Sequence, residues 1–390
     1  MKNIFRFRLL IIICILPLFL TTYSSFANIA DKKYMYNFYL ERPLTQNTSA
    51  DHFLNGAEFL QYGLDSFKIE TPFVKALVGI YPAGLLFVLN HEISGHAIRV
   101  LENNLTVFEV RVTGDLKGIT RFTQPKNIIQ YMVIALGGVE ASHVLAQKIK
   151  KRYFDKKMVI TNIMGATYWF ASTDQFNYTG LIEKYTDAHD IKRYVDNVNK
   201  YYKDDKFLSL EELSSLGYID LLDPFLLFSI YSAITGMDIE IPTIKIGDLG
   251  YLPQARLVLA PYGTEIKIMN HFYYDDKYFQ LNFNYGKNKN KTSYMVEFNA
   301  DKIYEQDKYF IGTNIAIWQQ PELLIDEEDN KIDGNNAQNK IGGKAVAIMG
   351  MNISEDLAIR FEVGYKTQGY NAGDIVREGW IFRAGLELRF

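Results

Sequence analysis

The sequence predicts an α+β protein in which a mainly helical N-terminal part, residues 28–247, is followed by an eight-stranded antiparallel β-barrel, residues 250–390. Periodicity predicts this division. Residues before 247 form long segments with helical spacing, whereas later residues alternate apolar and polar side chains in runs of about ten. The chain also contains 27 Tyr and 26 Phe, an aromatic content typical of proteins that build aromatic girdles.

The N-terminus has the pattern of a secretory signal peptide. Lys2, Arg6 and Arg8 precede the apolar run LLIIICILPLFL, and Ser25-Phe26-Ala27 has the small-x-small form of a cleavage site. We therefore expect residues 1–27 to be removed and the mature chain to be exported.

Composition excludes several classes of site. Cys14 is the only cysteine and lies within the expected signal peptide, so His, Asp and Glu remain as the good metal ligands. Loss of three cations leaves 39 Lys and Arg against 45 Asp and Glu, a formal charge of −6 in place of −3. Neither a basic cluster nor a Gly-rich phosphate loop is present, so we expect no nucleic-acid and no nucleotide partner.

The helical part contains four strongly apolar segments. Each uncharged run is at most about fifteen residues long, fewer than the roughly twenty that span a bilayer. The segments are residues 76–90, 128–139, 159–171 and 225–236. We expect them to be buried helices of a domain on the periplasmic side of the membrane.

Capping residues predict where three helices begin. Asp187 precedes an amphipathic run and is expected to be its N-cap. Ser209 and Glu212 form a capping box, and Asp223-Pro224 places proline in a first turn, where its missing donor is harmless.

Eight candidate strands follow residue 254. In order they are ARLVLAPYG, TEIKIMNHF, YFQLNFNYG, TSYMVEFNA, YFIGTNIAIW, KAVAIMGMNI, LAIRFEVGY and WIFRAGLELRF. An even number of strands of this length suits the smallest membrane barrels, whose interior is filled by side chains and forms no pore. Residues 354–356 predict a short turn, and residues 319–342 and 368–379 predict long loops. A soluble eight-stranded barrel or a two-layer β domain would alternate in the same way.

The last strand, together with the signal peptide and the aromatic content, favours the membrane barrel over these alternatives. Trp380, Phe382, Leu386 and Phe390 share one face, and charged residues occupy the other. The strand resembles the C-terminal assembly signal of bacterial outer-membrane barrels, which alternates and ends in Phe. This resemblance implies an outer-membrane barrel of a Gram-negative bacterium, in contact with lipid.

The motif LNHEISGHAIRV, residues 89–100, is the strongest candidate for chemistry. Zinc peptidases carry H-E-x-x-H, whose histidines lie four apart on one helical face, but here His91 and His96 lie five apart. In a regular helix their directions would differ by roughly 140°. A π-turn at Ser94-Gly95 would restore a common face. Alternatively, Glu92 and His96 form the matched pair and His91 lies aside.

The residues HEISGHA resemble the HExGHA helix of zinc metallopeptidases, including the site-2 and FtsH-like families, with one residue inserted. The resemblance implies that His91 and His96 are zinc ligands. It also implies that Glu92 is the catalytic general base, which takes a proton from the attacking water.

A third ligand must come from elsewhere in the chain. The best candidates are Glu140 and His143 in LGGVEASHVLA, which lie three apart on one helical face. The preceding Gly137-Gly138 would allow close approach to the first helix. Asp174 and Asp223 are lesser candidates.

A structural alternative remains open. His91, His96 and His143 could be buried, hydrogen-bonded core residues with Glu140 as a structural partner. Of the other histidines, His189 is expected to be an exposed residue at a helix start, and His52 and His271 are isolated.

These observations favour a zinc-dependent hydrolase, most simply a metallopeptidase that acts on a peptide or protein at the periplasmic side of the outer membrane and is anchored by its barrel. One alternative is a non-catalytic barrel protein whose helical domain is structural or binds a partner. Another is a soluble periplasmic enzyme with a β domain that does not enter the membrane.

Overall fold

The computed structural model describes residues 34–67, 69, 71–155, 159–181, 189–275 and 277–389. The expected signal peptide, the predicted cap Asp187 and the terminal Phe390 lie outside the described residues.

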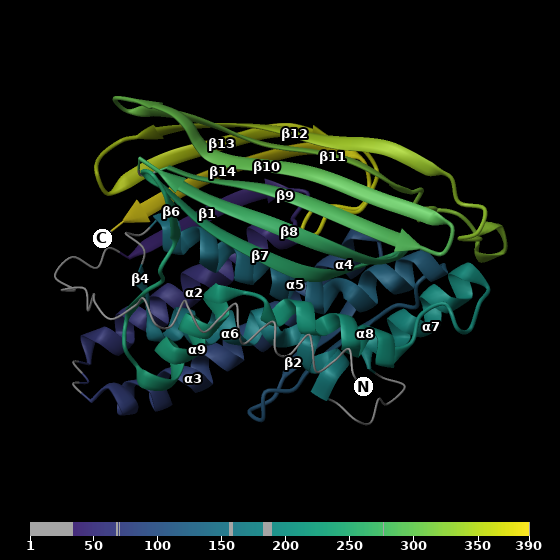
Figure 1. Cartoon of the computed structure of the whole chain (residues 1–390), viewed down its shortest axis with the longest axis horizontal. Helices are drawn as coiled ribbons and strands as arrows, with labels where there is room; N and C mark the ends of the chain where they lie inside the picture. The colour runs from purple at the N-terminus through teal and green to yellow at the C-terminus, as the bar shows by residue number, and fades with distance from the viewer. Residues whose placement is uncertain are drawn as a thin grey trace.

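The fold is α+β, with one large antiparallel sheet and a layer of helices on one of its faces (Figure 1). The sheet has ten strands in the order β1-β14-β13-β12-β11-β10-β9-β8-β7-β6. The strands are β1 Met35–Arg42, β6 Ile244–Ile246, β7 Leu249–Ala260, β8 Gly263–Tyr274, β9 Lys277–Asn288, β10 Lys291–Gln306, β11 Tyr309–Pro321, β12 Asn339–Asn352, β13 Leu357–Lys366 and β14 Gly379–Arg389. Strands β7 to β14 form one continuous meander.

All eight predicted strands are present, and the long connections, residues 322–338 and 367–378, fall where expected. The prediction of a sheet with only these eight strands was incomplete. β1, from the predicted helical part, pairs with β14, and β6 pairs with β7. Since β7 and β14 are not paired with each other, the described sheet has two edges and is not shown to close into a barrel.

The helical layer is made mostly of the segment between β1 and β6. Its helices are α2 Gln46–Ser66, α3 Pro72–Leu89, η1 Asn90–Ala97, α4 Ile98–Glu102, α5 Ile128–Asp155, α6 Asn162–Phe176, η2 Asn177–Leu181, α7 Asp190–Tyr202, α8 Leu210–Gly217, η3 Tyr218–Leu221 and α9 Pro224–Thr235, and a short η4 Asp329–Lys331 lies in the β11–β12 connection. Two small sheets accompany them, β2 Val107–Val112 with β3 Gly118–Phe122, and β4 Val159–Ile160 with β5 Ile239–Glu240.

The capping residues act largely as predicted. The Ser209 hydroxyl accepts a hydrogen bond from the Glu212 amide, and Asp223 caps α9 with Pro224 in the first turn. The N-cap of α7 is His189, which is half-buried against Tyr178 and not exposed as predicted.

The helical and β parts share one hydrophobic core. Buried side chains of α5 and α7 pack with Leu257 of β7 and with Leu323 and Tyr370 from the two long connections. The change in periodicity near residue 247 therefore marks a change of secondary structure inside one packed body.

The expectation that every apolar helix is too short to span a membrane was wrong. Within the described residues, two helical segments are long and apolar enough to do so, Pro72–Glu102 and Ile128–Asp155. Their uncharged runs are short, but isolated charges and polar residues extend the helices beyond them. The most apolar window of Ile128–Asp155 is 89% buried, as predicted, whereas that of Pro72–Glu102 is only 28% buried.

Candidate metal centre

The HEISGH motif forms a π-helix, η1 (Asn90–Ala97), which continues α3. Because one π-turn contains an extra residue, side chains five apart return to the same face. The Nε2 atoms of His91 and His96 lie 3.3 Å apart, and both side chains are buried. The predicted π-turn at Ser94-Gly95 is therefore present.

Close packing on α5 holds η1 in place. Gly95 lies against Gly137 and Gly138, and a Cβ added at Gly95 would come within 2.6 Å of the Gly138 Cα. A methyl group at Gly138 would overlap the His91 imidazole. The predicted close approach of the two helices at Gly137-Gly138 is thus observed, and it leaves the space that the His91 ring occupies.

Asp190, the first residue of α7, brings a carboxylate to the two histidines. Its Oδ2 lies 3.1 Å from His96 Nε2 and 3.8 Å from His91 Nε2. Donors about 2.0–2.1 Å from a tetrahedral zinc ion lie roughly 3.3–3.4 Å from one another. Burial opposes ionisation of Asp190, but attraction to His96 and hydrogen bonds with both imidazoles outweigh it and lower the pKa of the carboxyl.

The second nitrogen of each imidazole is also held. His91 Nδ1 lies 2.9 Å from Asp174 Oδ2, and His96 Nδ1 lies 2.8 Å from the carbonyl oxygen of Ile134. Acceptors at Nδ1 place the proton there and leave Nε2 free to bind a metal, the usual outer shell of a metal-binding histidine. Asp174 therefore fixes the orientation of the His91 ring through Nδ1, the nitrogen that does not face His96.

Glu92 completes the group. Metal-binding atoms of His91, Glu92 and His96 all lie within 4.8 Å of one another, so this group could hold a metal ion. The Thr120 hydroxyl donates a 2.7 Å hydrogen bond to Glu92 Oε2, and β3 passes so close that a Cβ at Gly118 would overlap the carboxylate. Glu92 is thus fixed in position at the edge of the histidine pair.

The structure places Glu140 and His143 away from this group. Glu140 forms a two-bond ion pair with Arg99 and accepts a 2.9 Å hydrogen bond from the Gly373 amide. His143 lines a separate cavity beneath the sheet. Asp223 is paired with Lys150, 3.0 Å away.

Two further aromatic residues surround the centre. Tyr178 of η2 stacks on His91 with ring centroids 5.6 Å apart, and the His189 ring lies 4.6 Å from that of Tyr178. The histidine pair is therefore enclosed by η1, α5, α6, η2 and the start of α7.

No protein-family model and no curated protein sequence matches the chain, so only the geometry bears on what this group of residues does. Sequence reasoning missed Asp190 because an acidic residue in the first turn of an amphipathic helix is an ordinary capping feature. Its role depends on α7 folding back onto η1, which no local pattern encodes.

Proposed function

We propose that the protein is a zinc-dependent hydrolase of the peptidase type, held in a membrane by its sheet. The observation that carries the proposal is the convergence of His91 Nε2, His96 Nε2 and Asp190 Oδ2 beside the carboxylate of Glu92. Three protein ligands next to a free carboxylate are typical of catalytic rather than structural zinc sites.

The donor set favours zinc. Two imidazoles and one carboxylate suit Zn²⁺ better than the harder Mg²⁺ or Ca²⁺, which take mainly oxygen ligands. When bound, zinc acts as a Lewis acid and lowers the pKa of a coordinated water to about 7.

Glu92 would act as the general base. Its Oε2 is occupied by the Thr120 hydroxyl, which leaves Oε1 to take a proton from the attacking water. As water adds to the carbonyl carbon and the C–N bond breaks, Glu92 returns that proton to the departing amine. Thr120 orients the carboxylate throughout.

Strand β3 supports a peptide as substrate. Within the described part of the chain, β3 pairs only with β2, and it passes beside Glu92 at Gly118 and Thr120. An unpaired strand edge binds an extended peptide by main-chain hydrogen bonds. A peptide added to this edge would run past the metal centre.

The outward face of the sheet supports anchoring in lipid. Aliphatic and Phe side chains, among them Ile268, Phe283, Val296, Ile315 and Phe382, are exposed at mid-strand. Exposed aromatic residues lie at both ends of this band, namely Tyr285, Tyr294, Tyr365 and Trp380 at the end with the long connections and Tyr274, Tyr304 and Tyr309 at the other. An apolar band between aromatic rows is typical of outer-membrane strands, and we propose the outer membrane as the location.

Metal content of the full-length protein in detergent tests the proposed centre. We expect about one zinc per chain, lost in His96→Ala and Asp190→Asn but retained in Glu92→Gln. His52→Ala and Asp196→Asn are matched controls, since both residues are exposed and away from the centre. Absence of stoichiometric zinc in the native protein would contradict the proposal.

Hydrolysis tests the reaction. The zinc-loaded native protein should cleave an unfolded protein such as casein, and Glu92→Gln should lose this activity while keeping its zinc. Equal cleavage by both proteins would show that Glu92 is not the base.

A further inference from the structure

Side chains from the helices bond several backbone groups at both edges of the sheet. At one edge, Asn55 of α2 accepts a hydrogen bond from the Asn37 amide and donates one to the Asn37 carbonyl, at 2.8 and 2.6 Å. The Arg152 guanidinium donates to the carbonyl of Met35. These bonds join part of the outer backbone edge of β1 to α2 and α5.

Backbone groups of β7, at the opposite edge, also bond to side chains of the helical layer. The Leu257 amide of β7 donates to Asp220 at 2.8 Å, and the Leu257 carbonyl accepts from Gln175 at 3.1 Å. The Tyr194 hydroxyl donates to the Ala260 carbonyl. Strand edges with unsatisfied backbone groups do not occur in contact with lipid, and here the helices satisfy several of those groups in place of a neighbouring strand.

Helices α2, α3 and α9 also expose an apolar surface. We call it the helix patch, and it consists of Phe59, Tyr62, Phe67, Phe73, Val74, Leu77, Val78, Tyr81, Tyr231 and Ile234. These residues come from α2 and the residue after it, from α3 and from α9, and α3 contacts both of the other helices. Helices α3 and α9 lie on the side of the helical layer away from the sheet (Figure 1). Lys75, in the first turn of α3, is paired with Asp65 at 2.6 Å.

The helix patch continues the apolar face of the sheet. On one side it meets β1, where Phe38 and Leu40 are exposed and Tyr34 packs edge-on against Tyr62. On the other side, Ile244 and Ile246 of β6 are exposed beside β7. Exposed apolar side chains therefore lie on the sheet, on both of its edge strands and on the helix patch.

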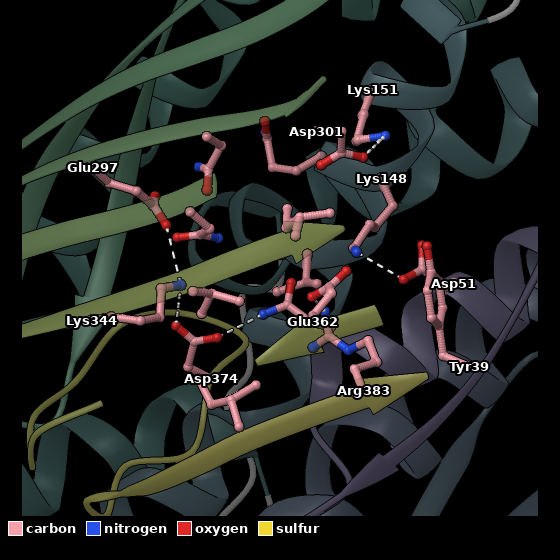
Figure 2. Close-up of a pocket in the computed structure, with 18 of the residues that line it drawn as sticks. Tyr39, Asp51, Lys148, Lys151, Glu297, Asp301, Lys344, Glu362, Asp374 and Arg383 are labelled. Carbon is pink, nitrogen blue, oxygen red and sulfur yellow. Dashed lines mark hydrogen bonds and ion pairs between the residues drawn. The ribbon is translucent and has the colours of Figure 1, made fainter. Parts of the chain in front are cut away.

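One cavity of the interior is lined by charged side chains, in contrast to the apolar outer face of the sheet. A cavity of about 150 Å³ lies between the inner face of the sheet and helices α2 and α5 (Figure 2). Ion pairs cross it, with Lys148 bound to Asp51, Lys151 to Asp301 and Lys344 to Asp374, at 2.8, 2.6 and 2.6 Å. A charged cavity beneath the sheet and apolar side chains on the outer face of the sheet match the two faces of outer-membrane strands.

We infer that lipid acyl chains cover the helix patch, so that α2, α3 and α9 complete the membrane-facing perimeter that the sheet alone leaves open. This inference rests on the proposed anchoring in a membrane and not on the proposed zinc chemistry. A second copy of the chain would need only one apolar face, whereas here apolar side chains are exposed both on the sheet and on the helices. The helical layer is then part of the membrane body and not a separate periplasmic domain.

A polar boundary limits how far the helices are immersed. The Tyr81 hydroxyl donates to the Gly114 carbonyl in the β2–β3 turn, which exposes Asp115 and Lys117. His91 lies ten residues beyond Tyr81, or about 15 Å along a helix. The metal centre is thus separated from the helix patch by this turn, and we expect it to lie outside the hydrocarbon layer.

Fluorescence quenching by brominated phosphatidylcholine tests the inference in proteoliposomes of the full-length chain. Single cysteines in a Cys14→Ser background carry the fluorophore, with Leu77→Cys on α3, Ile315→Cys on the sheet and Lys117→Cys in the turn. All three side chains are exposed, so labelling should not disturb packing. We expect brominated lipid to remove most of the emission at positions 77 and 315 and almost none at position 117.

Each of the other quenching results would contradict one specific claim. Quenching at position 315 without quenching at position 77 would show that the helix patch is outside the lipid. If the label at position 77 is then protected from a water-soluble quencher only in cross-linked dimers, a second copy covers the patch. No quenching at either position would overturn the anchoring itself. Zinc content of the same preparations is unaffected by these results, so the failure of one proposal is distinguishable from that of the other.

Discussion

At the scale of single residues, the centre depends on the absence of a side chain at Gly138. Because a methyl group there would overlap the His91 ring, we expect Gly138→Ala to displace the ring and abolish stoichiometric zinc binding. Gly63→Ala is the matched control, since a Cβ at this helical glycine meets no atom within 4 Å and should be neutral or slightly stabilising. Zinc content of the two purified variants checks the prediction. Full zinc in Gly138→Ala would contradict the model of the centre.

The contact between Asp174 and His91 should tune metal affinity. Asn at position 174 can still accept a hydrogen bond but has no charge to raise the basicity of the imidazole. We expect Asp174→Asn to bind zinc about 10- to 100-fold more weakly, the range found for outer-shell carboxylates. Competition with a chromogenic chelator measures this affinity. An unchanged affinity would mean that Asp174 only fills space.

At the scale of elements, the centre joins η1 to α7, since the histidines and Asp190 come from different helices. Metal bound only by the folded state stabilises it, by about 2.7 kcal/mol at a free concentration 100 times the dissociation constant. We expect chelation to increase hydrogen exchange at the start of α7 and to lower the unfolding temperature. Asp190→Asn should exchange at the faster rate with or without chelator. Equal exchange in the native protein before and after chelation would show that Asp190 is not a ligand.

The sequence predicted those elements whose cause is local. The eight strands alternate, the caps of α8 and α9 are determined by adjacent residues, and the five-residue spacing of His91 and His96 suggested the π-turn as one of two arrangements. Asp190, the pairing of β1 with β14 and the exposure of α3 depend on contacts between distant segments. A pattern of two to seven residues contains no information about such contacts, so the third ligand was sought at Glu140 and His143 instead.

At the scale of the whole molecule, the sheet and the helices share a hydrophobic core, enclose one charged cavity and expose apolar side chains on their outer faces. Neither part forms this arrangement alone. Side chains of the helices bond backbone groups at the edges of the sheet, and residues of both parts line the cavity. We therefore propose a single unit in which the sheet anchors the protein and the helices packed on it hold the metal centre.

The apolar surface predicts a stability effect that depends on depth. Ile315 lies at the middle of β11 and Tyr309 at its end, and both are exposed. In a bilayer, we expect Ile315→Lys to lower the free energy of unfolding by about 2–4 kcal/mol and Tyr309→Lys by about 0–1 kcal/mol, since a lysine near the interface can reach water. Urea titration of protein folded into phospholipid vesicles measures both values. If water rather than lipid faces β11, neither lysine has to leave an aqueous environment, and the difference between the two positions disappears.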